Sequence, residues 1–202
     1  MKFKELLKKT WNFIWHDDSL LSWIINVVLA FILVKFIIYP GFGLLLSTNY
    51  PIVAVVSCSM EHNTQPDCSL SHLNFDEWWS TRGEWYTNKE FTKEQFKNFN
   101  FNNGFNKGDI MILQGIQPKN IKIGDILVYQ SQIYPNPIIH RVVKITQKNS
   151  MYYFTTKGDN NQDPDPWEIS EQQIKSTGKA IIKIPYLGWV KIWFTNLIGA
   201  IK

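Results

Sequence analysis

Two hydroxyl-bearing residues follow a short apolar run in the first third of the chain. The run Pro51–Val56 ends abruptly in Ser57, Cys58, Ser59 and Met60. A serine hydroxyl becomes a nucleophile only when a base within hydrogen-bond reach takes its proton. The stretch is therefore either a polar turn or a strand that delivers a nucleophile, and the rest of the chain decides between them.

A histidine and an acidic turn farther along supply complementary chemistry. His140 is the single histidine of the apolar run Ile138–Val143, and Asp159, Asp163 and Asp165 lie in the turn after an aromatic run. Histidine accepts a proton near neutral pH, and a carboxylate behind it fixes its tautomer. Alone, the histidine has an ordinary role in a core or on a surface. A calcium loop is excluded for the turn, because no Glu closes a 12-residue loop.

Short runs of β-branched and aromatic residues predict the strands that position these groups. The runs are Ile52–Val56, Asp109–Leu113, Ile126–Gln130, Ile138–Ile145, Met151–Thr156 and Lys179–Ile184. No βαβ alternation is present, so we expect a mainly β fold and no nucleotide-binding parallel sheet. The long aromatic segment Glu61–Lys107 predicts a satellite subdomain near a cleft, with one short helix opened by a capping box at Thr92.

An apolar run near the N-terminus predicts a membrane anchor. Leu20–Tyr39 is long enough to cross a bilayer and carries Lys35 as its one charge, and Pro40 is expected to end the helix. Four lysines among the first nine residues put this end in the cytoplasm. A cleaved secretory signal fits less well, because its apolar core is only about 7–15 residues long. A buried helix of a soluble domain is the other alternative.

Composition narrows the class further. The 202 residues carry a net charge of +4 without a basic stripe, so we expect no nucleic-acid partner. Cys58 and Cys68 lack the spacing of a zinc site, and two free thiols are favoured over a disulfide. The apolar tail Ile184–Lys202 is predicted to lie in the membrane interface, to dock on the domain, or to cross the membrane a second time.

Taken together, the motifs resemble the type I signal peptidases of the archaeal and endoplasmic-reticulum branch, whose general base is histidine. SCSM after a strand, then GDI, GDILVY, IIHRVV and TKGDNN, occur in the order of that family. The resemblance covers Pro51–Met60 and roughly Gly108–Leu187. It implies a signal-peptidase-like β-rich catalytic domain and a membrane-bound serine endopeptidase. Such an enzyme removes signal peptides after small residues and needs no metal or organic cofactor.

The resemblance also implies a role for each matching residue. Ser59 matches the nucleophile and His140 the general base. Asp165 matches the carboxylate of the triad, and Asp159 matches a supporting acid that shapes the loop. Ser57 matches a position whose hydroxyl, together with the Ser59 backbone N–H, helps to hold the oxyanion.

The chain departs from the family pattern at several positions. Cys58 replaces the usual Gly between the serines, and His62 replaces a Pro and is a rival base three residues from Ser59. Asp163 fits neither acidic position. Glu61–Lys107 replaces a connection of a few residues, and the sequence does not say how a substrate reaches the site past this insertion. An inactive membrane-anchored binding or scaffold protein of the same fold is the alternative function; a repressor-like self-cleaving protease would need a DNA-binding domain and a Lys base.

The expected organisation follows from these observations. Residues 1–19 form a cytoplasmic segment, 20–46 the transmembrane anchor, 47–187 an extracytoplasmic protease domain with the insertion 61–107, and 188–202 an amphipathic or membrane-associated segment. The expected location is the cell membrane, or the endoplasmic-reticulum membrane in a eukaryote. The expected partners are secretory preproteins and the lipid bilayer. The sequence leaves open whether the chain also has accessory subunits.

Overall fold

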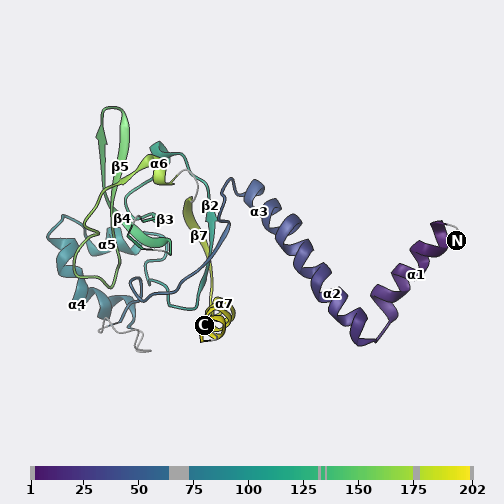
Figure 1. The fold of residues 1–202 in the computed structure, drawn as a ribbon. Helices are drawn as coiled ribbons and strands as arrows, with labels where there is room; N and C mark the ends of the chain where they lie inside the picture. Colours follow the sequence, from purple (N-terminus) through teal and green to yellow (C-terminus); the bar gives the residue numbers. More distant parts are fainter. Residues whose placement is uncertain (1–2, 64–72, 132, 135, 175–177, 201–202) are drawn as a thin grey trace. The chain divides into compact units, whose positions relative to one another are not determined.

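The structure, a computed structural model, describes residues 3–63, 73–131, 133–134, 136–174 and 178–200. The chain divides into two compact units, Met1–Leu45 and Leu46–Lys202 (Figure 1). Each unit is described by itself.

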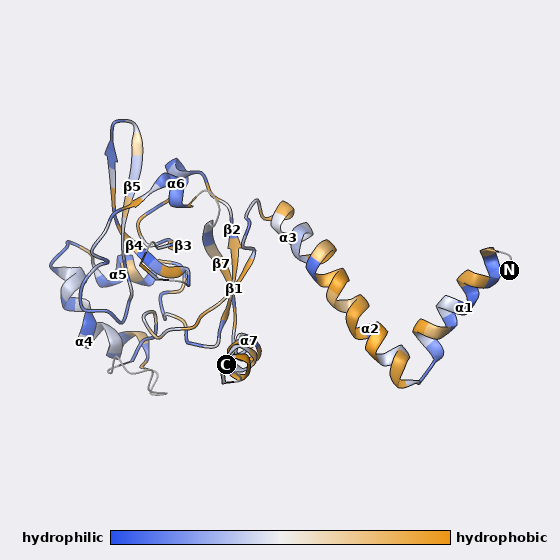
Figure 2. Ribbon diagram, in the orientation of Figure 1, coloured by the Kyte–Doolittle hydropathy of each residue, from blue (hydrophilic) through white to orange (hydrophobic). Residues whose placement is uncertain are grey.

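The first unit consists of two helical stretches. α1 (Phe3–His16) is followed by a continuous helix made of α2 (Leu20–Leu33), η1 (Val34–Ile38) and α3 (Tyr39–Leu45). The Ser22 hydroxyl donates a hydrogen bond of 2.6 Å to the Phe13 carbonyl and so joins α1 to α2. Among the described residues, the helix Leu20–Leu45 is the one that is long and apolar enough to cross a membrane, as its colouring in Figure 2 illustrates.

The expectation that Pro40 ends this helix is wrong. The helix continues through Pro40 to Leu45, and the turn before the proline widens instead. In this π-helical turn the Tyr39 N–H bonds to the Val34 carbonyl, five residues earlier. Proline lacks an N–H and its ring crowds the carbonyl four residues before it. The wider turn gives that ring room, because it shifts the local hydrogen bonds by one residue.

The second unit is built on one seven-stranded antiparallel sheet. Its strands are β1 (Ile52–Ala54), β2 (Ile110–Gln114), β3 (Ile126–Tyr129), β4 (Ile138–Lys148), β5 (Met151–Lys157), β6 (Ile169–Ser170) and β7 (Gly178–Ile184). Their order in the sheet is β1-β2-β7-β3-β4-β5-β6. The mainly β prediction is confirmed, and the six predicted strands differ from the observed ones by at most three residues at either end.

Two apolar clusters form the core of the sheet. One gathers side chains of β1, β2, β7, β3 and β4 around Met60 and Met111, which are fully buried. The other gathers side chains of β3, β4 and β5 around Leu127 and Phe154. Met60 ties the end of the SCSM motif to the core, so the serines before it are held at a fixed place.

The aromatic segment forms a small subdomain with a core of its own. It contains α4 (Phe75–Thr87) and α5 (Lys93–Lys97). Thr92 caps α5 in a capping box, as predicted. The longer α4 was not predicted, although Asn74 and Glu77 form the same signature in the sequence. The fully buried rings of this core are Trp78, Tyr86 and Phe96, packed against Val143 of β4.

Three short or terminal helices complete the unit. They are η2 (Pro118–Asn120), α6 (Glu171–Ile174) and α7 (Trp189–Ala200). The start of α7 is docked, because Trp189 lies directly against Gly108 and under the Lys107 ammonium group. Farther along, Trp193 and Phe194 are exposed. The tail thus docks at one end and presents apolar side chains along the rest.

Candidate functional site

Ser59 lies in a short segment that is anchored on both sides. Before it, Val55 continues the pairing of β1 through backbone hydrogen bonds with Gly108 and Asp109. After it, the buried Met60 accepts a hydrogen bond from the Phe105 N–H. The hydroxyl between these anchors is therefore presented from a fixed backbone.

His140 is brought to this hydroxyl by β4. It pairs with Leu127 of β3 and is buried, although one edge of the ring reaches the cleft. The Ser59 Oγ is 2.9 Å from His140 Nε2, which is hydrogen-bond distance. The two residues are 81 positions apart in sequence.

Asp165 lies behind the histidine. Its backbone N–H donates to the Thr156 carbonyl of β5, and its Oδ2 is 2.8 Å from His140 Nδ1. The Tyr129 hydroxyl (2.9 Å) and the Thr156 hydroxyl also donate to Oδ2. Burial opposes ionisation, but the hydrogen bonds and charge of His140, followed by those two hydroxyls, lower the pKa of Asp165 overall.

These contacts form an ordered chain from hydroxyl to carboxylate. With the Nδ1–H of His140 donated to Asp165, the Nε2 lone pair faces Ser59 and can accept its proton. This is the arrangement that activates a serine hydroxyl for attack on a carbonyl carbon.

A cleft of about 540 Å³ opens beside the Ser59 hydroxyl. Its apolar wall is made by Ala54, Val56, Ile138 and Ile139. Ser57 lines the same cleft, and its Oγ is 3.3 Å from Ser59 Oγ. A chain in extended conformation could lie here beside β1, which is an edge strand of the sheet.

The other acidic candidates lie elsewhere. Asp159 is completely buried and forms a bidentate ion pair with Arg141, with 2.7 Å from its Oδ2 to Nη2. Burial alone would raise the pKa of Asp159, but the charge of Arg141 holds that pKa well below its ordinary value. Asp163 lines the cleft, and no hydrogen bond between it and His140 is found among the described residues.

The rival base His62 points away from the serine. Its Nε2 is 3.3 Å from Asp159 Oδ2, and its ring is stacked on Trp78 at a centroid distance of 3.8 Å. Burial lowers the pKa of His62. The ring is therefore neutral near pH 7 and donates its Nε2–H to the carboxylate.

Cys58 is accommodated between the serines with ordinary backbone geometry. It is not among the described residues with positive φ, so its Cβ adds no backbone strain. Its carbonyl accepts hydrogen bonds from the Glu61 N–H and from the Asn160 side chain. Cys58 takes part in a disulfide, so the preference for a free thiol is wrong there. Cys68 lies outside the described residues.

Comparison with curated proteins identifies what the chain is similar to. It is 30% identical over 115 residues to the signal peptidase complex catalytic subunit sec11 of Schizosaccharomyces pombe, a match that covers 46% of this chain and 61% of that protein. It is 34% identical over 94 residues to the human subunit SEC11C, with 44% and 49% covered. The subunit of Scheffersomyces stipitis is 26% identical over 167 residues, with 80% and 75% covered.

The chain is a homologue of signal peptidase catalytic subunits. The resemblance inferred from the motifs is thereby confirmed. The chain spans about half the length of the first curated relatives that it matches. No family model matches the chain.

Sequence reasoning missed the residues that hold Asp165 and Asp159 in place. Tyr129 and Thr156 bind Asp165, and Arg141 and Tyr86 bind Asp159. One signal was readable. Tyr129 lies two residues after Leu127, the partner of His140, so strand periodicity puts it on the histidine's face once β3 and β4 are paired.

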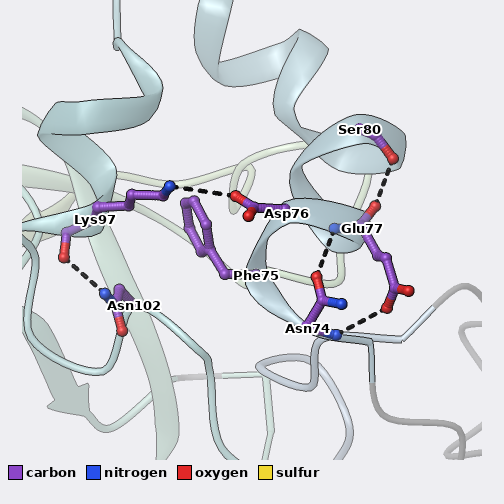
Figure 3. A pocket seen from close by; sticks show the side chains of 7 residues that line it. All are labelled: Asn74, Phe75, Asp76, Glu77, Ser80, Lys97 and Asn102. Atoms are coloured by element: carbon purple, nitrogen blue, oxygen red, sulfur yellow. Dashed lines mark hydrogen bonds and ion pairs between the residues drawn. The ribbon is translucent and has the colours of Figure 1, made fainter.

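A second hollow, of about 640 Å³, lies at the start of α4 (Figure 3). Its lining is Asn74, Phe75, Asp76, Glu77, Ser80, Lys97 and Asn102. Asn74 and Glu77 form the helix cap there, and Asp76 pairs with Lys93 and Lys97. The polar groups of this hollow are thus engaged in holding the subdomain together. Within the described ranges, no group of three or more His, Cys, Asp or Glu is arranged to hold a metal ion.

Proposed function

We propose that the chain is a membrane-anchored serine endopeptidase that removes N-terminal signal peptides from secretory precursors. The observation that carries the proposal is the continuous hydrogen-bonded chain from Ser59 through His140 to Asp165 at the wall of a cleft. The similarity to catalytic subunits of signal peptidase complexes supports the choice of substrate.

The proposed reaction has two half-reactions, acylation of Ser59 and hydrolysis of the acyl-enzyme. Ser59 Oγ attacks the scissile carbonyl carbon while His140 Nε2 takes its proton, and the same nitrogen then protonates the leaving amine. A water molecule, activated by His140, hydrolyses the acyl-enzyme and restores Ser59. Asp165 stays ionised and stabilises the imidazolium. The Ser57 hydroxyl and the Ser59 backbone N–H hold the oxyanion.

The substrate segment binds as an extended strand beside β1. Its carbonyl and amide groups pair with the free edge, and alternate side chains enter the cleft. The apolar wall of Val56, Ile138 and Ile139 receives the small side chains on the acyl side of the bond.

The proposed topology follows the anchor. Residues 1–19 lie in the cytoplasm, 20–46 cross the membrane, and the catalytic domain 47–187 lies on the other side, with 188–202 at the membrane surface. The exposed apolar side chains of α7 support the last point. The membrane is that of the endoplasmic reticulum or the cell surface. Since the relatives are subunits of a complex, accessory subunits are expected to join this chain.

Cleavage of a radiolabelled secretory precursor by the detergent-solubilised full chain tests the proposal. We expect the wild type to release the signal peptide, Ser59→Ala and His140→Ala to release none, and Ser57→Ala to be slower by about 10²–10³-fold. Ser80→Ala, a serine of α4 that lines the second hollow, is the matched control and should cleave normally. Undiminished cleavage by Ser59→Ala would contradict the assignment, and a folded but inert wild type would favour the scaffold function.

A further inference from the structure

We infer that the inserted subdomain (residues 73–107) braces the loop that holds the nucleophile, and that Tyr86 is a positioning residue for Ser59. This inference rests on the proposed function. The loop in question is Gly158–Asn161, between β5 and Asp165, and is called the clamp loop below.

The clamp loop grips the backbone around the nucleophile. The Asn160 N–H donates to the Ser59 carbonyl (2.8 Å), and the Asn160 side chain donates to the Cys58 carbonyl (3.2 Å). Gly158 approaches so closely that a Cβ there would lie 2.7 Å from the Ser59 carbonyl oxygen. Any displacement of the loop therefore moves the backbone that carries the reactive hydroxyl.

The inserted subdomain reaches this loop through Tyr86. The ring lies in α4, fully buried among Trp78 and Phe96, and its hydroxyl donates to Asp159 Oδ1 at 3.2 Å. Asp159 is the second residue of the clamp loop. Hydrogen bonds to a buried carboxylate are among the strongest that a neutral donor makes. The hydroxyl thus links a rigid aromatic core to the loop.

Arg141 makes a second link between the two parts. Its guanidinium pairs with Asp159 and also donates to the carbonyls of Asn100 and Phe101 in the inserted subdomain, each at 2.9 Å. It lies over the ring of Phe96, 4.7 Å from the centroid. A buried guanidinium with all these partners cannot move without breaking several of them.

A third link is made by Lys157, immediately before the clamp loop. Its ammonium group is buried 5.1 Å from the ring centroid of Trp85 and 4.8 Å from that of Tyr86. Cation–π contacts of this kind hold a desolvated ammonium group in place. α4 thus supplies rings on one side of the loop while His62, stacked on Trp78, supports Asp159.

The described part of the insertion does not form the substrate cleft. None of the described residues between 61 and 107 belongs to the cleft lining. The insertion therefore acts through the clamp loop rather than as a wall of the cleft.

Tyr86→Phe is the sharpest test, because it removes one hydroxyl and keeps the ring under Lys157. In the full chain in detergent, we expect kcat for precursor cleavage to fall about tenfold with KM unchanged, because the nucleophile is misplaced while the cleft is intact. Phe91→Leu is the matched control: it loosens the same aromatic cluster without touching the clamp loop, and should stay within about twofold of wild type. Lys157→Met is a second variant that should act in the same direction as Tyr86→Phe.

Hydrogen exchange supplies a readout that does not depend on activity. We expect the amides of 158–161 to exchange faster in Tyr86→Phe, and those of β4 and β5 to be unchanged. An inert wild type would defeat the proposed function while exchange still tests the brace. If both variants keep the wild-type exchange rates in 158–161 and the wild-type kcat, the inference is wrong. If the loop amides exchange faster but kcat is unchanged, Tyr86 is not a positioning residue for Ser59.

Discussion

Two aspartates six residues apart serve different ends, and their surroundings explain why. Asp165 accepts hydrogen bonds at the edge of the cleft, from His140 and two hydroxyls. Asp159 is completely buried against the guanidinium of Arg141. In the proposed mechanism, Asp165 therefore faces the reaction and Asp159 holds the structure.

Replacement of each aspartate by asparagine should separate these roles. Asp165→Asn should lower turnover about 10³–10⁴-fold, because the imidazole loses its tautomer control. Asp159→Asn should lower the free energy of unfolding by about 3–5 kcal/mol, because it leaves Arg141 buried without its ion pair. Asp163→Asn is the control and should change neither quantity appreciably. If Asp165→Asn and Asp159→Asn lose turnover equally and are equally stable, the two aspartates do not have separate catalytic and structural roles.

Tyr129→Phe tests the hydroxyls behind Asp165. The variant loses one donor to the carboxylate, so the pKa of Asp165 should rise and kcat should fall about fivefold. Tyr153→Phe, on β5, is the matched control. Steady-state cleavage rates across the pH range are the measurement, and an unchanged profile would show that the Thr156 hydroxyl suffices.

The residues of the proposed site can be picked out from the sequence, whereas the residues that support them cannot. Ser59, His140 and the two aspartates occur in motifs, so a resemblance can point to them. Tyr86 and His62 reach Asp159 only because α4 folds over the loop, and that contact spans 73 residues for Tyr86 and 97 for His62. Local patterns carry no signal for contacts of that range.

At the scale of elements, predictions succeeded where periodicity and caps agree. Six strands can be predicted because short runs of β-branched and aromatic residues are separated by Gly, Asn, Pro and Lys. α4 is hard to predict because its aromatic residues lie on several faces of the helix and form no single apolar face. Its capping box is nevertheless visible in the sequence. The anchor helix passes through Pro40 by a π-helical turn, which no local propensity forecasts.

The docking of α7 depends on a glycine at the end of the insertion. Gly108 has φ of +91°, and a Cβ there would lie 2.1 Å from Trp189 Nε1. Gly108→Ala should therefore displace the start of α7 and lower the thermal unfolding midpoint by several degrees, about the effect of 1–2 kcal/mol. Gly199→Ala, with nothing within 4 Å, is the matched control and should have no such effect. Trp fluorescence and thermal unfolding in detergent check both.

At the scale of the whole molecule, buried ionisable groups make stability depend on pH. Burial lowers the pKa of His62. Below about pH 6.5, His62 is therefore protonated in the unfolded chain while it is still neutral in the folded chain. Stability should fall as pH drops through that value. The lowered pKa values of Asp159 and Asp165 add a second loss below about pH 4, again because the unfolded state takes up more protons.

His62→Gln should remove the first of these losses and keep the second. Thermal unfolding of wild type and variant between about pH 3 and 8 is the measurement. A wild-type midpoint that stays level from pH 7 to 5 would contradict the assignment of a neutral buried imidazole.

The position of β7 sets the order in which this molecule can be completed during synthesis. In the described sheet, β7 lies between the pair β1 and β2, which leads to Ser59, and the pair β3 and β4, of which β4 carries His140. That strand ends at Ile184, 125 residues after Ser59, and so leaves the ribosome well after Ser59 does. A nascent chain that ends before β7 contains Ser59 and His140 but lacks the strand that lies between their two strand pairs. In the proposed enzyme, Ser59 and His140 should therefore come into register only after β7 has left the ribosome.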